Sequence, residues 1–341
     1  MKFAFIIDPI QKLDPCHDTS VALMEAAQEL GHEVWVTQAN LLSVVNGKAW
    51  AILQPVQLVP IQLLEGRWIA AQPWYSLGAA SLDAAQADTL GNLRPLEEMD
   101  VVFMRTDPPV TTAYLYATYI LDYIDPTKTL VVNSPSGLRA ANEKMYALQF
   151  TEAIPTTIVT QDKQVIRQFV EEQGAAVLKP LGGKAGEGIL FLQAGDRNLN
   201  SMIEISTQQG LLPIMIQTYL PDAKAGDKRI ILLDGEPIGA VNRVPTGNEF
   251  RGNMAVGGRV EAVEITQRER DICAQLAPVL RRDGLIFVGI DVIGGYLTEV
   301  NVTSPTGVRE IDRLNQSRLG HQVIQWLEKA KASQLSVSSP A

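Results

Sequence analysis

Three side chains with oxygen donor atoms lie close together near the carboxyl end of the chain. Asp291 stands in one apolar stretch, and Glu299 and Asn301 stand in the next, beyond a glycine pair. Residues two apart on a strand point to the same face, so Glu299 and Asn301 share one. A three-residue loop, 294–296, would place Asp291 opposite Glu299, whereas a two-residue turn would pair Asp291 with Thr298 and turn it away. Gathered together, these oxygens suit Mg²⁺ shared with substrate phosphates. We predict this metal site over an ordinary half-exposed hairpin, because Asp and Asn are poor strand residues.

A glycine-rich loop, residues 182–188, separates two other apolar stretches. It precedes no helix, and its spacing fits neither a P-loop nor a dinucleotide fingerprint. Its backbone amides can form an anion nest over phosphates, and an ordinary long hairpin loop is an equally good interpretation of the loop alone. Lys179 ends the strand before the loop, where it has either a phosphate partner or an extended stem that reaches the sheet edge. The local sequence around Lys144 predicts a solvated position on a helix.

Four arginines recur downstream of this loop, among several glycines: Arg229, Arg243, Arg251 and Arg259. A guanidinium group binds carboxylate or phosphate in bidentate fashion. In an acidic protein the grouping predicts a local anion site, although each arginine alone is equally compatible with an ordinary surface position.

The composition is that of a globular protein and excludes several classes. The 341 residues are 46% hydrophobic and carry 29 Lys and Arg against 38 Asp and Glu, a net charge of −9. This charge argues against nonspecific nucleic-acid or acidic-membrane partners. Two cysteines and three histidines are too few for a Cys/His metal cluster or a disulfide framework. No apolar run approaches the ~18 residues of a membrane span, and the apolar start of the chain stops at Asp8-Pro9, as a strand does and a signal peptide does not. We expect a cytoplasmic protein.

The first 140 residues alternate between strand and helix patterns, which predicts a parallel sheet with helices on its faces. A small hairpin insertion is expected between residues 50 and 74. No glycine-rich turn follows the first strand, so a Rossmann dinucleotide site is excluded. The predicted strands are Phe3–Ile7, Val34–Thr37, Met99–Met104 and Leu130–Val132, and the predicted helices are Thr19–Leu30 and Ala113–Ile124.

Two further units follow, with mixed helix and strand patterns. The second has helices at Arg139–Phe150 and Lys163–Gln173 and strands at Thr156–Val159, Ala175–Lys179, Ile189–Leu192 and Pro213–Tyr219. The third has a helix at Arg268–Arg281 and strands at Arg229–Leu233, Ile238–Val241, Leu285–Ile293 and Tyr296–Val302. We place the units at residues 1–138, 139–220 and 221–330, and expect a frayed tail at 331–341.

The ordered set of motifs resembles the ATP-grasp ligases. It runs Asn-Glu-Lys, Leu-Lys-Pro with the glycine loop, Gln-Thr-Tyr-Leu, Asp-Lys-Arg, Arg-Gly-Asn, Gly-Leu-Ile-Phe-Val-Gly-Ile-Asp and Thr-Glu-Val-Asn-Val-Thr-Ser-Pro-Thr. More closely, the chain is similar to the prokaryotic-type glutathione synthetase family over roughly its first 325 residues, from Ile-Asp-Pro-Ile through Phe-Met-Arg-Thr-Asp-Pro-Pro to Arg309-Glu310. One departure is the glycine loop, which in the family often reads Asp-Gly-x-Gly-Gly.

The resemblance implies an α/β protein, α+β in its C-terminal half, with an ATP-grasp fold behind a parallel-sheet pre-ATP-grasp domain. It implies ATP-dependent ligation of γ-glutamylcysteine to glycine through an acyl phosphate, in a homo-oligomer, either a tetramer or a dimer. The alternatives are another carboxylate–amine ligase of this fold and, from a different class, a non-catalytic nucleotide-binding regulatory module. The stretch Arg105-Thr106-Asp107-Pro108-Pro109 favours the synthetase over the first, and the complete set of metal ligands with Arg229 disfavours the second.

The resemblance also implies a role for each site residue. Two Mg²⁺, replaceable by Mn²⁺, would bind Asp291, Glu299 and Asn301. The mobile loop 244–259 would shield the acyl phosphate. The ATP site would comprise Lys144, Lys179, Gly182, Gly183, Lys184, Gly186, Gly188, Gln217, Tyr219 and Leu220. The catalytic residues would be Arg229, Arg243, Arg251 and Asn253. The dipeptide would lie near Asp18, Ser20 and Arg105, and glycine near Ser304, Pro305 and Thr306.

Overall fold

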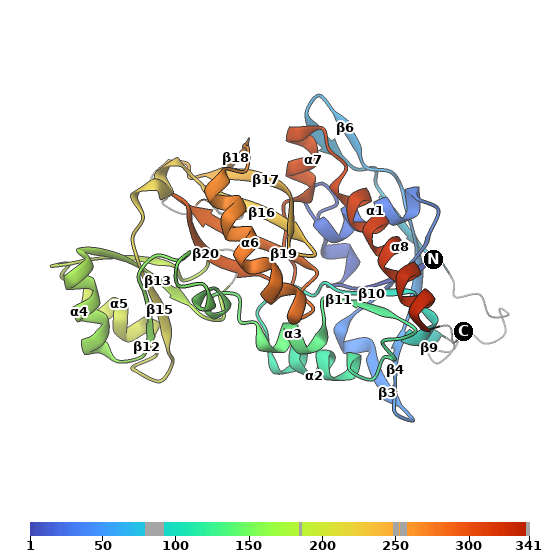
Figure 1. Cartoon of the computed structure of the whole chain (residues 1–341), viewed down its shortest axis with the longest axis horizontal. Coiled ribbons are helices and arrows are strands. Elements are labelled where there is room, and N and C mark those ends of the chain that lie inside the picture. The colour runs from blue at the N-terminus through green and yellow to red at the C-terminus, as the bar shows by residue number, and fades with distance from the viewer. Residues whose placement is uncertain (79–91, 184–185, 248–251, 253–257, 339–341) are drawn as a thin grey trace.

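The computed structural model describes the chain except for residues 79–91, 184–185, 248–251, 253–257 and 339–341. Three sheet-based regions follow one another along the chain, and the central one projects away from the other two (Figure 1). Among the described helices, none combines the length and apolarity of a membrane span.

The N-terminal region is built on a six-stranded sheet in the order β11-β10-β1-β2-β5-β8. Strands β11, β10, β1 and β2 are parallel, as predicted, and β5 and β8 add antiparallel strands at one edge. Strand β1 is apolar throughout Phe3–Ile6 and fully buried, because helices cover both faces of the sheet. The bounds are β1 Lys2–Ile6, α1 Thr19–Glu29, β2 Glu33–Thr37, β5 Gln54–Leu58, β8 Tyr75–Leu77, β10 Val101–Met104, α2 Thr112–Leu121, β11 Leu130–Val132 and α3 Pro135–Ala140.

The predicted small hairpin insertion between residues 50 and 74 is wrong in extent. Part of that segment is strand β5, which pairs with β2 and extends the main sheet. The rest belongs to a three-stranded sheet, β3-β4-β9, and to a separate hairpin, β6-β7. Trp50, Pro55 and Trp68 lie inside strands rather than at turns, and the local sequence could not reveal which strand each segment would join. The bounds are β3 Leu42–Val45, β4 Lys48–Ile52, β6 Gln62–Leu64, β7 Arg67–Ile69 and β9 Leu93–Pro95.

The central region is a four-stranded antiparallel sheet, β12-β15-β13-β14, with two helices packed on it. Its apolar core, which includes Ile166, Leu178 and Ile216, is separate from the rest of the interior. Helix α4 begins and ends where its apolar period predicts, after Asp162, whose side chain caps it. The bounds are β12 Thr157–Thr160, α4 Lys163–Gln173, β13 Ala175–Pro180, β14 Leu190–Gln193, α5 Leu199–Ser206 and β15 Ile214–Thr218.

The C-terminal region is a five-stranded antiparallel sheet, β18-β17-β16-β19-β20, covered by helix α6. Asp291 lies opposite Glu299, but the predicted three-residue loop is wrong. The turn has two residues, Gly294 and Gly295, both at positive φ, and a β-bulge that absorbs Thr298 restores the pairing. The bounds are β16 Asp227–Leu233, β17 Glu236–Val244, β18 Arg259–Ala262, α6 Gln267–Arg282, β19 Phe287–Ile293 and β20 Tyr296–Asn301.

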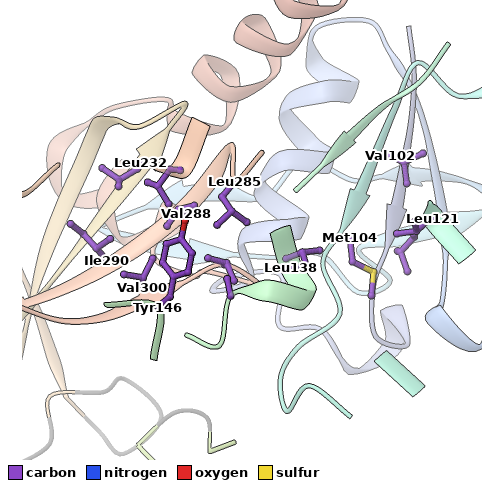
Figure 2. Packing of buried hydrophobic residues seen from close by; sticks show 14 of the residues in the cluster. Val102, Met104, Leu121, Leu138, Tyr146, Leu232, Leu285, Val288, Ile290 and Val300 are labelled. Atoms are coloured by element: carbon purple, nitrogen blue, oxygen red, sulfur yellow. The ribbon is translucent and has the colours of Figure 1, made fainter. Parts of the chain in front are cut away.

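The N-terminal and C-terminal regions share their interior. One apolar cluster runs without a break from Val300 and Tyr146 through Leu138 to Met104 (Figure 2). The C-terminal helices α7 (Val308–Asn315) and α8 (Leu319–Ser338) return to the N-terminal region, where α8 lies beside α1 (Figure 1). Residues 331–338 therefore belong to a helix rather than to the predicted frayed tail, and 339–341 lie outside the described residues.

Candidate active site

A cavity lies between the central sheet and the C-terminal sheet. Strands β13 and β15 line one side, and β16, β17, β19 and β20 line the other. Side chains predicted for four separate roles meet there. The predicted site residues that line it are Lys144, Lys179, Gly183, Gly186, Gln217, Tyr219, Leu220, Arg229, Arg243, Asp291, Glu299, Asn301, Ser304 and Thr306.

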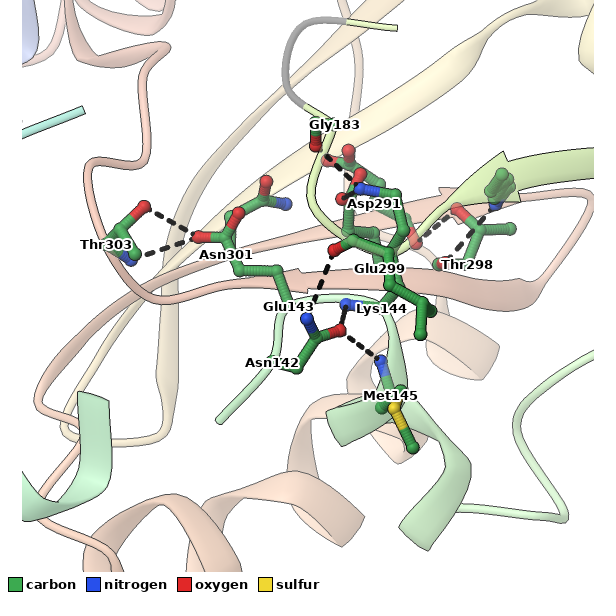
Figure 3. Close-up of polar contacts among 12 residues, drawn as sticks. Asn142, Glu143, Lys144, Met145, Gly183, Asp291, Thr298, Glu299, Asn301 and Thr303 are labelled. Atoms are coloured by element: carbon green, nitrogen blue, oxygen red, sulfur yellow. Dashed lines mark hydrogen bonds and ion pairs between the residues drawn. The ribbon is translucent and has the colours of Figure 1, made fainter. Parts of the chain in front are cut away.

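Lys144 is buried at the centre of the cavity wall, not solvated on a helix. The predicted helix Arg139–Phe150 is wrong, because α3 ends at Ala140 and a 3₁₀ turn begins only at Met145. Between them the Asn142 side chain accepts hydrogen bonds from the backbone N–H groups of Lys144 and Met145, at 3.2 and 3.1 Å. The turn directs the Lys144 ammonium to the Gly183 carbonyl (2.9 Å) and the Glu299 carboxylate (3.0 Å; Figure 3). A cation is thereby held between the glycine loop and the β19-β20 hairpin.

Lys179 enters the same cavity from strand β13. Its ammonium donates a long hydrogen bond, 3.4 Å, to the carbonyl of Thr298, the bulged residue. Burial lowers its pKa, and the Glu299 and Asp227 carboxylates oppose that shift. A lysine with so little direct pairing is placed to take an anionic ligand.

Asp291 and two arginines form a buried network on adjacent strands. Arg229 donates to both Asp291 oxygens, at 2.5 and 3.1 Å, and Arg243 lies 3.0 Å from one of them. Burial alone would raise the pKa of Asp291, but the two guanidinium groups outweigh it and hold the pKa well below its usual range. Arg229 also donates to the Thr306 carbonyl at 3.1 Å. The network fixes two cations in the cavity, where an arginine can bind a carboxylate or phosphate.

Asp227 and Glu143 belong to the site, and our sequence analysis missed both. Asp227 binds Arg243 at 2.6 Å, and burial raises its pKa to about 6 despite that partner. Glu143 accepts from the backbone N–H groups of Val302 and Thr303, at 2.9 and 3.0 Å, and so anchors the segment after β20 (Figure 3). Asp227 stands in the Asp-Lys-Arg motif, in which only the arginine was predicted to be a site residue. Nothing local distinguishes Glu143 from a surface glutamate.

Asp291, Glu299 and Asn301 all line the cavity, from the facing positions of β19 and β20. Two carboxylates and an amide oxygen are the hard donors that Mg²⁺ prefers, so the donor set fits the predicted metal. Among the described residues no group of three or more His, Cys, Asp and Glu forms a ready metal cluster. The predicted donor set differs from such a cluster, because it includes the amide of Asn301 and would be completed by phosphate oxygens.

The far end of the cavity is lined by Gln217, Tyr219 and Leu220, where the adenine was predicted. Gln217 is only 2% exposed and donates to the Thr157 hydroxyl at 3.1 Å. The Tyr219 ring meets Phe191 edge to face, 5.0 Å between centroids. The apolar side chains Val177 and Ile189 also line this end, and such a wall suits a flat aromatic base.

Asp18, Ser20 and Arg105 cluster at the end of the cavity nearest the N-terminal region. Arg105 joins the predicted dipeptide and glycine segments, since it donates to the Ser20 hydroxyl (3.1 Å) and to the Pro305 carbonyl (3.0 Å). Asp18 caps helix α1 by accepting from the Val21 N–H, and burial raises its pKa. None of Asp18, Ser20, Arg105 and Pro305 lines the cavity itself.

The remaining predicted residues do not line the described cavity. Gly182 stands beside it, and Gly188, at positive φ, packs on Pro180 instead. Lys184, Arg251 and Asn253 lie outside the described residues.

Several known proteins are similar to this chain. Two family models match it, the prokaryotic glutathione synthetase N-terminal domain over residues 1–139 and the prokaryotic glutathione synthetase ATP-grasp domain over residues 143–316. Curated relatives include the glutathione synthetases of Nostoc sp. (72% identical, covering 96% of this chain and 98% of the relative) and Gloeobacter violaceus (48% identical, covering 96% of each).

Solved structures support the fold alone, at lower identity. The D-cycloserine synthetase DcsG aligns with a TM-score of 0.63 at 14% identity, covering 97% of this chain and 100% of that one. The ATP-grasp ligase PsnB, complexed with minimal precursor, Mg and ADP, aligns with a TM-score of 0.60 at 17% identity, covering 97% and 98%. With both family models matched in chain order and relatives that cover 96% of its length, the chain belongs to the prokaryotic glutathione synthetase family of ATP-grasp ligases.

Proposed function

We propose that this chain joins γ-glutamylcysteine to glycine to form glutathione, with ATP converted to ADP and phosphate. The observation that carries the proposal is one cavity in which two lysines and two arginines lie with the predicted metal ligands Asp291, Glu299 and Asn301. Phosphoryl transfer needs positioning and positive charge rather than a covalent protein group, and this cavity supplies both. The family membership of the chain specifies the substrates.

In the proposed reaction the cysteinyl carboxylate of the dipeptide attacks the γ-phosphorus of ATP, and ADP leaves. The glycine amine then attacks the carbonyl of the acyl phosphate, and phosphate leaves. Lys144 and Lys179 hold ATP phosphates below the glycine loop, and Gln217, Tyr219 and Leu220 bind the adenine. In this scheme the Lys144 contacts with Gly183 and Glu299 rearrange to admit the nucleotide.

Arg229 and Arg243 stabilise the negative charge that develops on the transferring phosphoryl group. Their shared bond to Asp291 keeps the two guanidinium groups in place before the substrate arrives, so little reorganisation is needed during the reaction. Arg251 and Asn253 act with them from the loop 244–259, which closes over the acyl phosphate. Gly252, within that loop, lines the cavity, and a Cβ there would lie 2.3 Å from the Arg243 carbonyl oxygen.

Asp291, Glu299 and Asn301 would hold Mg²⁺, two ions in our proposal, with Mn²⁺ as a substitute. The ions would neutralise phosphate charge and orient the phosphates. Asp18, Ser20 and Arg105 bind the dipeptide, and the segment Ser304-Pro305-Thr306 receives glycine. We also propose that the chain acts in the cytoplasm as a homo-oligomer, a dimer or a tetramer.

The test is phosphate release from ATP with Mg²⁺ and γ-glutamylcysteine, measured with and without glycine. We expect release that requires both amino-acid substrates and equals the glutathione formed. Release only with other amino-acid pairs would instead assign another carboxylate–amine ligase. Tight ATP binding without release in any mixture would indicate a regulatory module.

A further inference from the structure

Two buried polar side chains near the cavity each keep one polar atom without a partner in the described part of the chain, and the proposed reaction uses only one of these residues, Arg105. Arg105 is 4% exposed and Tyr114, at the start of helix α2, is 3% exposed. Among the described residues, neither the Arg105 Nη1 nor the Tyr114 hydroxyl has a hydrogen-bond partner. A buried polar group without a partner costs roughly 1–3 kcal/mol, so two such donors close enough to act on each other's charge favour a ligand over a packing explanation.

The rest of the Arg105 guanidinium is already fixed in position. Its Nε donates to Ser20 and its Nη2 donates to the Pro305 carbonyl, which leaves Nη1 as the group that can meet a ligand. Pro305 lies between Ser304 and Thr306, which line the cavity, and the residues that follow Arg105 reach the cavity at Asp107. The unpaired nitrogen therefore lies behind the residues that line the cavity at its N-terminal end, within two residues of Asp107 and bonded to the segment 304–306.

Tyr114 shares this electrostatic environment. Burial, and then the Glu143 carboxylate, raise the pKa of its hydroxyl, while the Arg105 charge opposes them. The hydroxyl therefore stays protonated at physiological pH and can donate a hydrogen bond. An arginine N–H and a tyrosine O–H together offer two donors, which is the complement of a carboxylate.

The surrounding charges indicate which carboxylate. The Asp18 and Asp107 carboxylates both favour the charged form of Arg105, whose pKa burial lowers, and they supply anionic acceptors near the donor pair. Donors and acids together suit a group that carries a carboxylate and an ammonium at once. The glutamyl end of the dipeptide keeps both charges throughout the reaction, whereas the glycine amine must lose its proton to attack.

We infer that Arg105 and Tyr114 bind the free α-carboxylate of the glutamyl end, and that Tyr114 is a specificity-determining residue for the dipeptide. This inference rests on the proposed ligation. Tyr114 then selects a γ-linked glutamyl substrate over an acyl-cysteine without the α-carboxylate. A site built to hydrogen-bond one substrate group rejects the analogue that lacks it, because its own buried donors are left unpaired.

The experiment compares wild type with Tyr114→Phe on three substrates. They are γ-glutamylcysteine, γ-aminobutyrylcysteine, which lacks the α-carboxylate, and glutarylcysteine, which lacks the α-amine. For Tyr114→Phe we expect the KM for γ-glutamylcysteine to rise about tenfold, the scale of a hydrogen bond to a charged group. We expect its preference for γ-glutamylcysteine over γ-aminobutyrylcysteine to shrink by the same factor, whereas glutarylcysteine loses as much as the natural dipeptide. Tyr116→Phe, on the exposed face of the same helix, is the matched control.

Three outcomes would overturn the inference. A rise in the KM for glycine alone would assign the pair to the other substrate. An equal loss on γ-glutamylcysteine and γ-aminobutyrylcysteine would make Tyr114 structural, and unchanged KM values would leave its hydroxyl without a role. Loss of an unpaired hydroxyl should not lower Tm, so a lower Tm for Tyr114→Phe would identify a misfolded variant. In that case the three-substrate comparison is repeated with Ser20→Ala, which removes a hydrogen bond from Arg105. The wild-type arm tests the ligation separately, because failure to form glutathione there refutes the proposed function.

Discussion

Replacing Glu299 with Gln separates the metal role of this residue from its structural one. The Glu299 side chain is 22% exposed and accepts one hydrogen bond, at 3.0 Å, from the Lys144 ammonium. Glutamine keeps an oxygen in the same position, so this hydrogen bond survives with one charge removed. Partial exposure limits the loss to about 1 kcal/mol. For a protein of 341 residues such a loss lowers Tm by only about 1–2 °C.

The effect on turnover should be far larger. Substitution of groups that only support metal ligands typically costs 10–100-fold, so we expect loss of a direct carboxylate ligand to cost at least about 100-fold. That corresponds to about 2.7 kcal/mol of transition-state stabilisation. The Mg²⁺ concentration for half-maximal activity should rise as well, because a neutral amide attracts the cation less than a carboxylate.

The assay is phosphate release at saturating ATP, dipeptide and glycine, titrated with Mg²⁺. Glu236→Gln is the matched control, since its side chain is 71% exposed on strand β17 and pairs with Arg281 at the surface. Asp291→Asn is a poor substitute for the test, because Asp291 is buried between two guanidinium groups and its loss destabilises the fold. Turnover of Glu299→Gln within threefold of wild type, with an unchanged Mg²⁺ curve, would refute the metal assignment.

Three further predictions concern packing, a buried ion pair and the metal. Gly137→Ala should lower the free energy of unfolding, measured by chemical denaturation, by more than about 1 kcal/mol, because the new Cβ would lie 2.2 Å from the Asp283 carbonyl oxygen. Gly182→Ala is the control and should be near neutral, because a Cβ there would have nothing within 4 Å. Arg309→Met should cost about 3–5 kcal/mol in the same measurement, since it leaves Glu25, paired at 2.7 Å and buried, without its cation; a cost below 1 kcal/mol would show that the pair is dispensable. Chelation of divalent metal should abolish phosphate release, and Mg²⁺ or Mn²⁺ should restore it; activity that persists in excess chelator would contradict the proposed cofactor.

The sequence predicted most of the local structure well because local structure depends on neighbouring residues. Helix α4 and strand β11 have the predicted bounds, and Gly31 follows helix α1 at positive φ, as a helix stop requires. The prediction failed at two positions, where a side-chain cap and a backbone bulge interrupt the regular pattern. Asn142 caps the turn that ends the expected helix before Lys144. A bulge at Thr298 places Asp291 opposite Glu299, which the sequence analysis had attributed to a longer loop.

The sequence by itself determined which residues could carry this chemistry, since the identities and same-face spacing of Glu299 and Asn301 are local properties. Only the tertiary structure decided which charges meet. Lys144 reaches Glu299 across 155 residues, and Arg229 reaches Asp291 across 62. Burial, which raises the pKa of Asp227 to about 6, exists only after the sheets have packed. Periodicity indicates which face of a strand is apolar, but the choice of partner strand comes from long-range packing, and that choice assembles the site.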